Sequence, residues 1–301
     1  MKILPASLLS VLLVPAALAV PLFGPASPVA DLNSFASDQL TDLSADGLTA
    51  LLQTDRDSFR MEIYSSTRAT LSSPWSLPSN TDFAATNSGT NVGHGILSAD
   101  GLSLLFQENP HIKVATRASI ALPFSAGTPV PELNIGTFER PGKLSADGLR
   151  LYLEINSAFN TDLYLASRPS LSDPWGTPTQ GPFAANVNTV GAAELEPYVT
   201  PDELQLFFAS NRAGGIGGID IWWSSRASVS DPFSAPENVD SVNTFDSDRS
   251  PELFGSTLFF TTDRDGTFDV FTAPLVPEPG SLALLLAGGL GLLRRRRSPR
   301  L

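Results

Sequence analysis

Leu43-Ser44-Ala45-Asp46-Gly47-Leu48 returns unchanged at 97–102 and at 144–149, and it returns in a variant form at 199–204. The Ser or Thr positions of the four copies are separated by 54, 47 and 55 residues. An Asp-Gly pair between two apolar segments is typical of a tight turn that joins two strands. A period of about 50 residues therefore predicts a fold built from one repeated unit.

Each copy of the hexapeptide is followed by two short apolar segments, such as Leu151–Leu153 and Asp162–Leu165 in the third unit. An Arg then leads to a Pro-aromatic pair, as from Arg168 to Pro174-Trp175. No segment keeps the three- and four-residue apolar spacing of a helix over about ten positions. Short strands separated by Gly, Asp, Asn and Pro turns are typical of propeller blades. We predict an all-β fold, a β-propeller of five four-stranded blades.

The fifth unit, which begins at Pro251, has no segment left for an outer strand before the C-terminal region. The missing segment has a counterpart at the other end, because Val29–Asp38 resembles Val239–Asp248, which links the fourth unit to the fifth. We therefore predict that an N-terminal strand completes the fifth blade and closes the ring. Such pairing would remove open sheet edges, which otherwise invite aggregation.

Taken together, the Ser-Ala-Asp-Gly turns, the Asp-led third segments and the Asp-Pro-Trp stretches resemble TolB-type, WD-repeat-like β-propeller repeats of bacterial envelope proteins. The likeness covers about 250 residues. Such propellers usually have six blades, whereas five units are counted here. The resemblance implies a binding scaffold and transfers no catalytic residues.

The first 19 residues have the pattern of a secretory signal peptide. Lys2 supplies a positive start, Ile3–Leu18 is almost entirely apolar, and Ala17-Leu18-Ala19 is a small-x-small cleavage site. Pro5 and Pro15 argue against an uncleaved helix. We expect cleavage after Ala19 and export of residues 20–301.

The C-terminal region, residues 276–301, has three parts in a fixed order. Val276, Pro277, Glu278 and Pro279 come first, an apolar run over Leu282–Leu293 follows, and a basic cluster of Arg294, Arg295, Arg296 and Arg297 comes last. This order resembles the PEP-CTERM sorting signal of Gram-negative bacteria. The resemblance implies an exosortase-type processing peptidase as partner, a short C-terminal membrane helix, an inner-membrane-anchored precursor and a product at the cell surface or in the extracellular matrix.

The physics of the C-terminal region agrees with that resemblance. Twelve apolar residues form about 18 Å of helix, which is short of the roughly 30 Å hydrocarbon core of a bilayer. The Arg cluster would stay on the cytoplasmic side and leave the preceding domain, residues 20–275, outside the cytoplasm. We therefore expect a marginal, temporary membrane anchor.

Composition excludes several classes of function. The formal charge of the chain is −12, and residues 20–275 alone hold 13 basic and 30 acidic residues, a balance of −17. This sign argues against a nucleic-acid partner. The absence of Cys excludes a thiolate nucleophile and Cys-ligated zinc, while His94 and His111 are the only histidines. We predict neither a catalytic histidine nor a bound cofactor.

The repeated aspartates of the hexapeptide, Asp46, Asp100, Asp147 and Asp202, invite a metal-binding interpretation. Their place beside Gly between two strands favours a structural turn. The stretch Asp263–Asp269 has calcium-like oxygen spacing, but it lacks the distal Glu of a calcium loop, so a hairpin turn is favoured there and calcium is the alternative.

The aromatic residues at one repeat position, Trp75, Phe124, Trp175 and Phe233, could stack on sugars or pack between blades, and their recurrence favours packing. The sequence thus predicts a monomeric, non-catalytic scaffold or binding protein with a polysaccharide or protein ligand. The alternative is a propeller glycoside hydrolase or lyase, which would need two carboxyl groups about 5–9.5 Å apart in one cleft.

Overall fold

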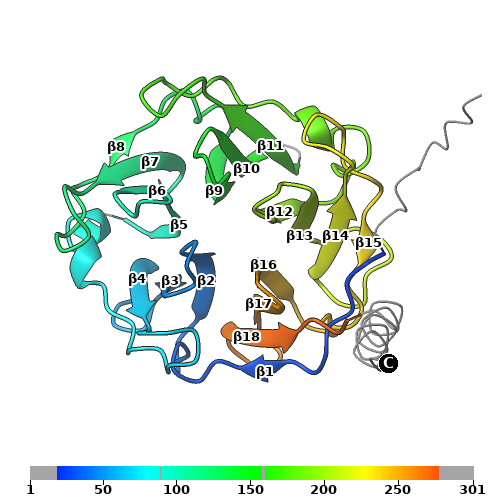
Figure 1. Ribbon diagram of the computed structural model, residues 1–301, viewed down its shortest axis with the longest axis horizontal. Coiled ribbons are helices and arrows are strands. Elements are labelled where there is room, and N and C mark those ends of the chain that lie inside the picture. The colour runs from blue at the N-terminus through cyan, green and yellow to red at the C-terminus, as the bar shows by residue number, and fades with distance from the viewer. Residues whose placement is uncertain (1–18, 89, 158–159, 278–301) are drawn as a thin grey trace, which may run out of the picture.

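The computed structural model describes residues 19–88, 90–157 and 160–277. Five antiparallel sheets are arranged around one axis, and each sheet is a blade of a β-propeller (Figure 1). The innermost strands are β2, β5, β9, β12 and β16, and each blade then runs outward in chain order, except that the outermost strand of the fifth blade is β1. The predicted five-bladed, all-β propeller is confirmed.

The strands follow the predicted repeat closely. Blade one holds β2 (Asp38–Leu43), β3 (Thr49–Thr54) and β4 (Glu62–Thr67); blade two holds β5 (Val92–Leu97), β6 (Ser103–Glu108), β7 (His111–Thr116) and β8 (Thr128–Pro129); blade three holds β9 (Phe138–Leu144), β10 (Arg150–Asn156) and β11 (Thr161–Ser167); blade four holds β12 (Glu194–Val199), β13 (Gln205–Ser210), β14 (Asp220–Ser225) and β15 (Glu237–Asn238); blade five holds β16 (Asp248–Phe254), β17 (Thr257–Thr262), β18 (Asp269–Pro274) and β1 (Ser27–Pro28). Three short 3-10 helices lie in the connections: η1 (Thr81–Phe83), η2 (Thr86–Ser88) and η3 (Gly181–Phe183).

The outer strand of a blade is its least regular part. It is two residues long in blades two, four and five, and it shortens to a single bridge in blades one and three. These bridges join Ser65 to Ser79 and Leu165 to Thr179, each with two backbone hydrogen bonds of 2.8–2.9 Å. Every blade therefore has a fourth, outer segment in the predicted position.

The N-terminal segment closes the ring. β1 pairs antiparallel with β18, with Ser27 opposite Thr272 and Pro28 opposite Phe271. A further bridge joins Phe23 to Leu275. Figure 1 shows β1 along the outer edge of β18, so the first described strand completes the last blade, as predicted.

Five asparagines repeat one structural role around the ring. The Nδ2 of each donates to a backbone carbonyl in the third strand of the preceding blade, and its Oδ1 accepts from the N–H of the same residue, at 2.8–3.1 Å. The pairs are Asn33 with Val270, Asn87 with Ile63, Asn134 with Ile112, Asn188 with Leu163 and Asn243 with Ile221. Asn33 gives the closure the same hydrogen bonds as every other connection between blades.

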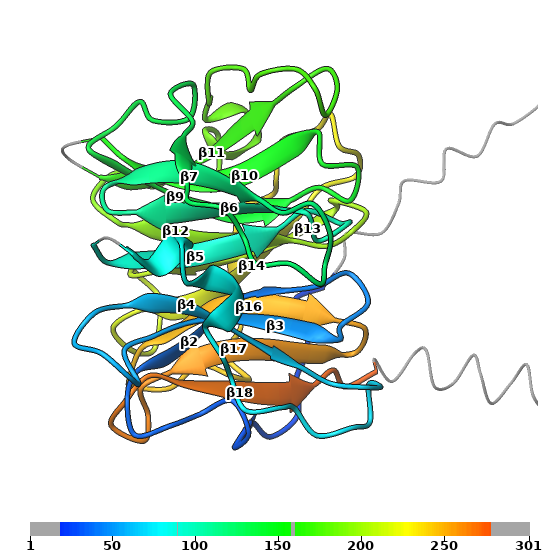
Figure 2. The ribbon, with the colours of Figure 1, turned by 90° about the vertical axis from the view of Figure 1, so that its left-hand side faces the viewer.

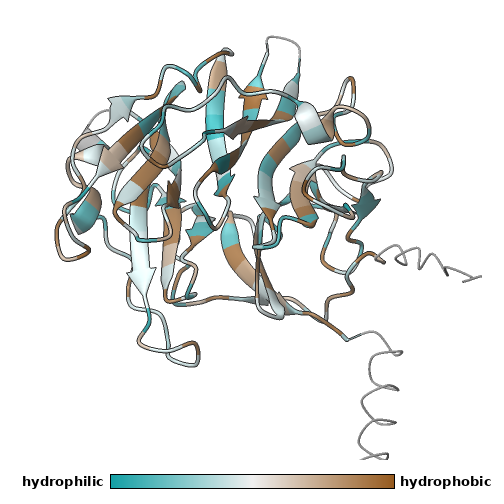
Figure 3. Ribbon diagram, turned by 45° about the horizontal axis from the view of Figure 1, so that its top comes forward, coloured by the Kyte–Doolittle hydropathy of each residue, from teal (hydrophilic) through white to brown (hydrophobic). Residues whose placement is uncertain are grey.

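Apolar side chains fill the space between neighbouring blades. Phe207 and Trp223 of blade four pack in one buried cluster with Phe260 of blade five. Hydrophobic and hydrophilic bands alternate along the strands, as a sheet with differing faces requires (Figure 3). Burial of each such aromatic side chain contributes about 1.5–3 kcal/mol.

Two predictions concern segments that the structure does not describe. The signal peptide and the apolar run Leu282–Leu293 lie outside the described residues. Within the described ranges, the chain has no helix with the length and hydrophobicity needed to cross a membrane.

We expect Asn33→Ala to lower the free energy of unfolding by about 1–3 kcal/mol, because it leaves the Val270 N–H without its acceptor, while Val270 O keeps its hydrogen bond from Val29 N. Urea denaturation of the two chains measures the difference. Asn211→Ala, at a loop asparagine whose hydrogen bond to Ala193 N is exposed, is the control and should change stability by less than about 0.5 kcal/mol. Equal losses in both variants would show that Asn33 has no special part in ring closure.

Candidate functional site

The four repeated aspartates lie in the turns between the first and second strands of their blades. Asp46 Oδ1 accepts from Ser44 Oγ at 2.6 Å and from Leu48 N at 2.9 Å, and the other three repeat both contacts. The Ser44 hydroxyl thereby lowers the pKa of Asp46. Gly47 follows with φ +68°, a conformation that a side chain would strain.

These turns surround a hollow on the propeller axis, which we call the bowl. Its volume is about 480 Å³. Three consecutive positions of every blade form its wall: Leu43–Ala45, Leu97–Ala99, Leu144–Ala146, Val199–Pro201 and Leu253–Gly255. The predicted turn residues are thus brought together at one end of the axis, where they hold an apolar wall in place.

The floor of the bowl is charged. Lys143 Nζ lies 2.7 Å from Asp42 Oδ1 and also contacts the Glu252 carboxylate, so it links blade three to blades one and five. Burial disfavours the charge on Lys143, but the two carboxylates raise its pKa above the usual value. Burial raises the pKa of Glu252 to about 7, against the opposing charge of Lys143.

Beneath this floor, the innermost strands share an irregularity. Each has a register shift against the second strand of its blade. In three blades the shift places a non-glycine residue at positive φ: His94 at 49°, Glu196 at 52° and Ser250 at 49°. Such bulges turn polar side chains and backbone groups toward the axis, and backbone strain of this kind clusters at functional sites.

A second group of ion pairs lies at these bulges. Arg249 contacts Glu196 at 2.7 Å, and Ser250 donates to the same carboxylate from its N–H and its hydroxyl. Arg140 contacts Glu154 at 2.7 Å. Burial alone would raise the pKa of Glu196, but Arg249 lowers it to about 2.

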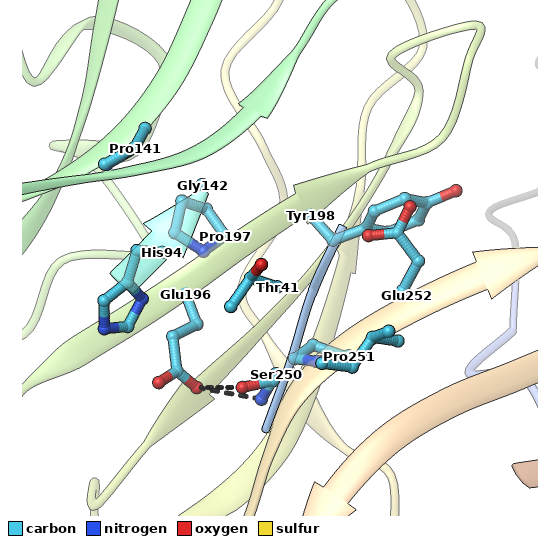
Figure 4. A pocket seen from close by; sticks show the side chains of 11 residues that line it. Thr41, His94, Pro141, Gly142, Glu196, Pro197, Tyr198, Ser250, Pro251 and Glu252 are labelled. Carbon is cyan, nitrogen blue, oxygen red and sulfur yellow. Dashed lines mark hydrogen bonds between the residues drawn. The ribbon is translucent and has the colours of Figure 1, made fainter. Parts of the chain in front are cut away.

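The space among these groups is small. A cavity of about 30 Å³, lined by His94, Glu196, Tyr198 and Glu252 among others, has room for one or two water molecules. In Figure 4, Glu196 points toward Ser250, while Glu252 lies on the opposite side of the cavity beside Tyr198. Ion pairs, and not an open passage, occupy this part of the axis.

The two histidines have separate places. Desolvation, with the nearby positive charge of Arg140, lowers the pKa of His94 to about 3 and keeps the ring neutral. His111 Nδ1 lies 2.8 Å from Glu139 Oε2, which joins blade two to blade three. The two side chains do not meet.

The remaining candidate positions belong to the framework. Trp75, Phe124, Trp175 and Phe233 are buried, and an Arg of the same unit covers each ring at 4.2–4.4 Å. Asp263 Oδ1 accepts from Ser247 N in the turn between β17 and β18. Across residues 19–277, apart from the gaps at 89 and 158–159, no group of three or more acidic or His side chains could hold a metal ion.

The sorting motif begins where the described chain ends. Val276 N donates to Leu22 O at 2.8 Å, and Pro277 is the last described residue. Glu278, Pro279 and the cluster Arg294–Arg297 lie outside the described residues.

Sequence reasoning missed the axial charges, above all Lys143, Glu196 and Arg249. The sequence marks these residues in one way only: they break the repeat, because corresponding positions of the five innermost strands differ in charge from unit to unit. A search for repeated residues passes over such positions.

We expect Lys143→Met to lower the free energy of unfolding by about 3–5 kcal/mol at pH 8, because it leaves two buried carboxylates without their cation. The pKa of Glu252 should then rise further, because Lys143 is the charge that lowers it, so the folded chain binds protons more tightly than the unfolded chain. The loss should therefore shrink as the pH falls toward 5. Urea denaturation at both pH values measures it.

The matched control is Lys113→Met, because the Lys113–Glu108 pair is more exposed than the Lys143 pairs. This substitution should cost at most about 1 kcal/mol. Adding Glu252→Gln to Lys143→Met should recover part of the loss. If Lys143→Met costs no more than the control at pH 8, the axial ion pairs do not hold the ring together.

Comparisons with known proteins agree with the fold and with the C-terminal motif. Residues 275–297 match the model of the PEP-CTERM protein-sorting motif, which indicates an exported protein with a C-terminal sorting signal. No curated protein sequence matches the protein. The solved structure of a glycoside hydrolase aligns with TM-score 0.55 and 8% identity, over 87% of this protein and 92% of that one.

Two further solved structures are similar. The catalytic domain of the GH62 α-L-arabinofuranosidase of Coprinopsis cinerea aligns with TM-score 0.51 and 12% identity, over 85% of this protein and 95% of that one. A putative TolB of Agrobacterium tumefaciens aligns with TM-score 0.49 and 15% identity, over 81% and 78%. The protein is thus a five-bladed β-propeller that carries a PEP-CTERM sorting motif.

Proposed function

We propose that this protein is a non-catalytic binding protein of the cell surface or extracellular matrix, processed by an exosortase-type peptidase, and that its ligand enters the bowl. One observation carries the proposal. The bowl is a preformed hollow of about 480 Å³ with an apolar wall from all five blades and a few charged groups at its floor. Binding sites for small molecules and side chains have this character.

The wall favours an apolar ligand group over a sugar. The aromatic rings that could stack on a saccharide are buried, and Arg side chains cover their faces. Leu, Val, Ala and Pro side chains dominate the wall instead. Aliphatic or aromatic side chains of a protein, or a comparable apolar group, therefore fit the bowl better than a polysaccharide does.

The axial charges also favour binding over catalysis. Asp42, Glu154, Glu196 and Glu252 each contact a cation at close range. The cavity that Glu196 and Glu252 line is too small for a sugar ring. Asp42 and Glu252 also line the floor of the bowl, but Lys143 contacts both of them there. A general acid or base must reach its substrate within hydrogen-bond distance, and these ion pairs would have to break first.

We expect residues 20–277, which contain all the described strands and the ring closure, to bind the uncharged fluorescent probe N-phenyl-1-naphthylamine saturably. Ala146→Trp fills the bowl and should weaken this binding at least about tenfold, or about 1.4 kcal/mol. Fluorescence titration measures both. Ala184→Trp, at an exposed site outside the bowl, is the control. Equal affinity in the two variants would exclude the bowl as the binding site.

One observation favours a second function, a glycoside hydrolase. Glu196 and Glu252 line the same cavity, and their surroundings move their pKa values apart, to about 2 and about 7. A base and an acid need such a pair. The similar fold of the Coprinopsis cinerea arabinofuranosidase domain supports this candidate only as an analogy of fold.

Hydrolysis of a panel of oligosaccharides, followed by release of reducing ends, separates the two functions. We expect no turnover by residues 20–277. Turnover that falls at least about 100-fold in both Glu196→Gln and Glu252→Gln would establish the hydrolase and refute the non-catalytic function. Turnover unchanged in both variants would point to a contaminating enzyme.

A further inference from the structure

The chain leaves the propeller at the edge of the bowl. β18 ends at Pro274, which pairs with Thr257. The next residue, Leu275, donates its N–H to Ser256 O at 2.7 Å, and Ser256 directly follows Gly255, a residue of the bowl wall. Figure 2 shows the described chain leaving the ring beyond the end of β18, so Pro277 lies at the bowl end of the axis and not at the opposite end.

The sequence beyond Pro277 is complementary to the bowl and its rim. Only residues 278–281 separate Pro277 from the apolar run Leu282–Leu293, a step of at most about 18 Å in an extended chain. Basic residues 294–297 follow the run. An apolar segment followed by positive charge is thus held within reach of an apolar hollow with acidic turns.

The rim of the bowl has both acidic and apolar residues. The turn aspartates are exposed around it: Asp46, Asp100, Asp147 and Asp202. Outside them lies a ring of exposed aliphatic residues at one repeat position: Leu71 (55% exposed), Ile120 (71%), Leu171 (65%) and Val229 (41%). Leu171 and Ile120 lie against the turn glycines Gly148 and Gly101, which places this ring on the same face as the bowl.

We propose that Leu282–Leu293 of the same chain docks on the bowl and inserts some of its apolar side chains there when the unprocessed protein is away from a membrane, with Arg294–Arg297 against the acidic rim. A short tether gives such a segment an effective concentration in the millimolar range, so a weak contact suffices. An anionic membrane surface is a poorer occupant, because a domain of charge −17 is repelled by it.

The inference rests on the proposed function and adds a control step to it. The bowl is covered while the C-terminal segment is attached, and removal of that segment at the sorting motif uncovers the bowl for its ligand. Processing would then release the domain and switch on binding in one cleavage.

The absence of native Cys permits a direct test by disulfide crosslinking in the mature full chain. One variant carries Ala99→Cys in the bowl wall and Leu285→Cys in the apolar run. Its control carries Val190→Cys with Leu285→Cys, because Val190 is fully exposed and precedes β12 at the end remote from the bowl. Both are oxidised at low concentration in buffer without detergent, and intrachain and interchain disulfides are separated by mass.

We expect the intrachain disulfide yield to be roughly tenfold higher with Ala99→Cys than with Val190→Cys, as a docked tether requires. Equal yields would overturn the inference. Disulfides formed only between chains would overturn it too, because the occupant would then be a second copy.

Probe binding distinguishes failure of this inference from failure of the proposed function. N-phenyl-1-naphthylamine should bind the full chain poorly, and it should bind a full chain with Leu285→Asp and Leu286→Asp as tightly as it binds residues 20–277. Tight binding to all three would overturn only the occupancy of the bowl by the protein's own segment. Binding to none of them would overturn the proposed function itself.

Discussion

The structure depends first on the pairing of β1 with β18. A propeller blade that lacks its outer strand leaves an open sheet edge, and a ring built from five consecutive units has its ends side by side. Here the N-terminal segment supplies that strand, and Asn33 gives it the same two hydrogen bonds to Val270 that every other blade connection has. Closure thus makes the two ends of the propeller neighbours, which is why Val276 can pair with Leu22 at the start of the sorting motif.

The second constraint is electrostatic and lies on the axis. Five twisted sheets leave their innermost strands facing one another, and an apolar sequence there would leave the bulged backbone groups without partners. The protein places charged side chains at these positions, so that Lys143 spans three blades and Glu196 joins blade four to Arg249 of blade five. The same contacts that hold the ring together occupy the carboxylates that a hydrolase would need free.

The sequence predicts the repeated features of this molecule well and the unrepeated ones poorly. Blade number, turn positions and the closing strand follow from a pattern that occurs four or five times, so each copy supports the others. The axial site follows from no such pattern: Asp42 and Lys143 are 101 residues apart, and only the closed ring brings them together. The bowl is predictable in part, because the sequence predicts its turns but only the folded ring shows that they meet around the axis.

The wall and the floor of the bowl differ in how closely they repeat from blade to blade. The wall repeats the tripeptide Leu-Ser-Ala in three blades, with Val-Thr-Pro in the fourth and Leu-Phe-Gly in the fifth, and none of these residues is charged. It therefore offers no charge by which a ligand could be oriented. The floor differs from blade to blade: Asp42, Lys143, Tyr198 and Glu252 line it, while the corresponding residue of the second blade, Ile96, is buried in the core. Because only the floor breaks the fivefold pattern in charge, any discrimination between polar ends of apolar ligands must come from Lys143 and its two carboxylates, while the wall supplies affinity alone.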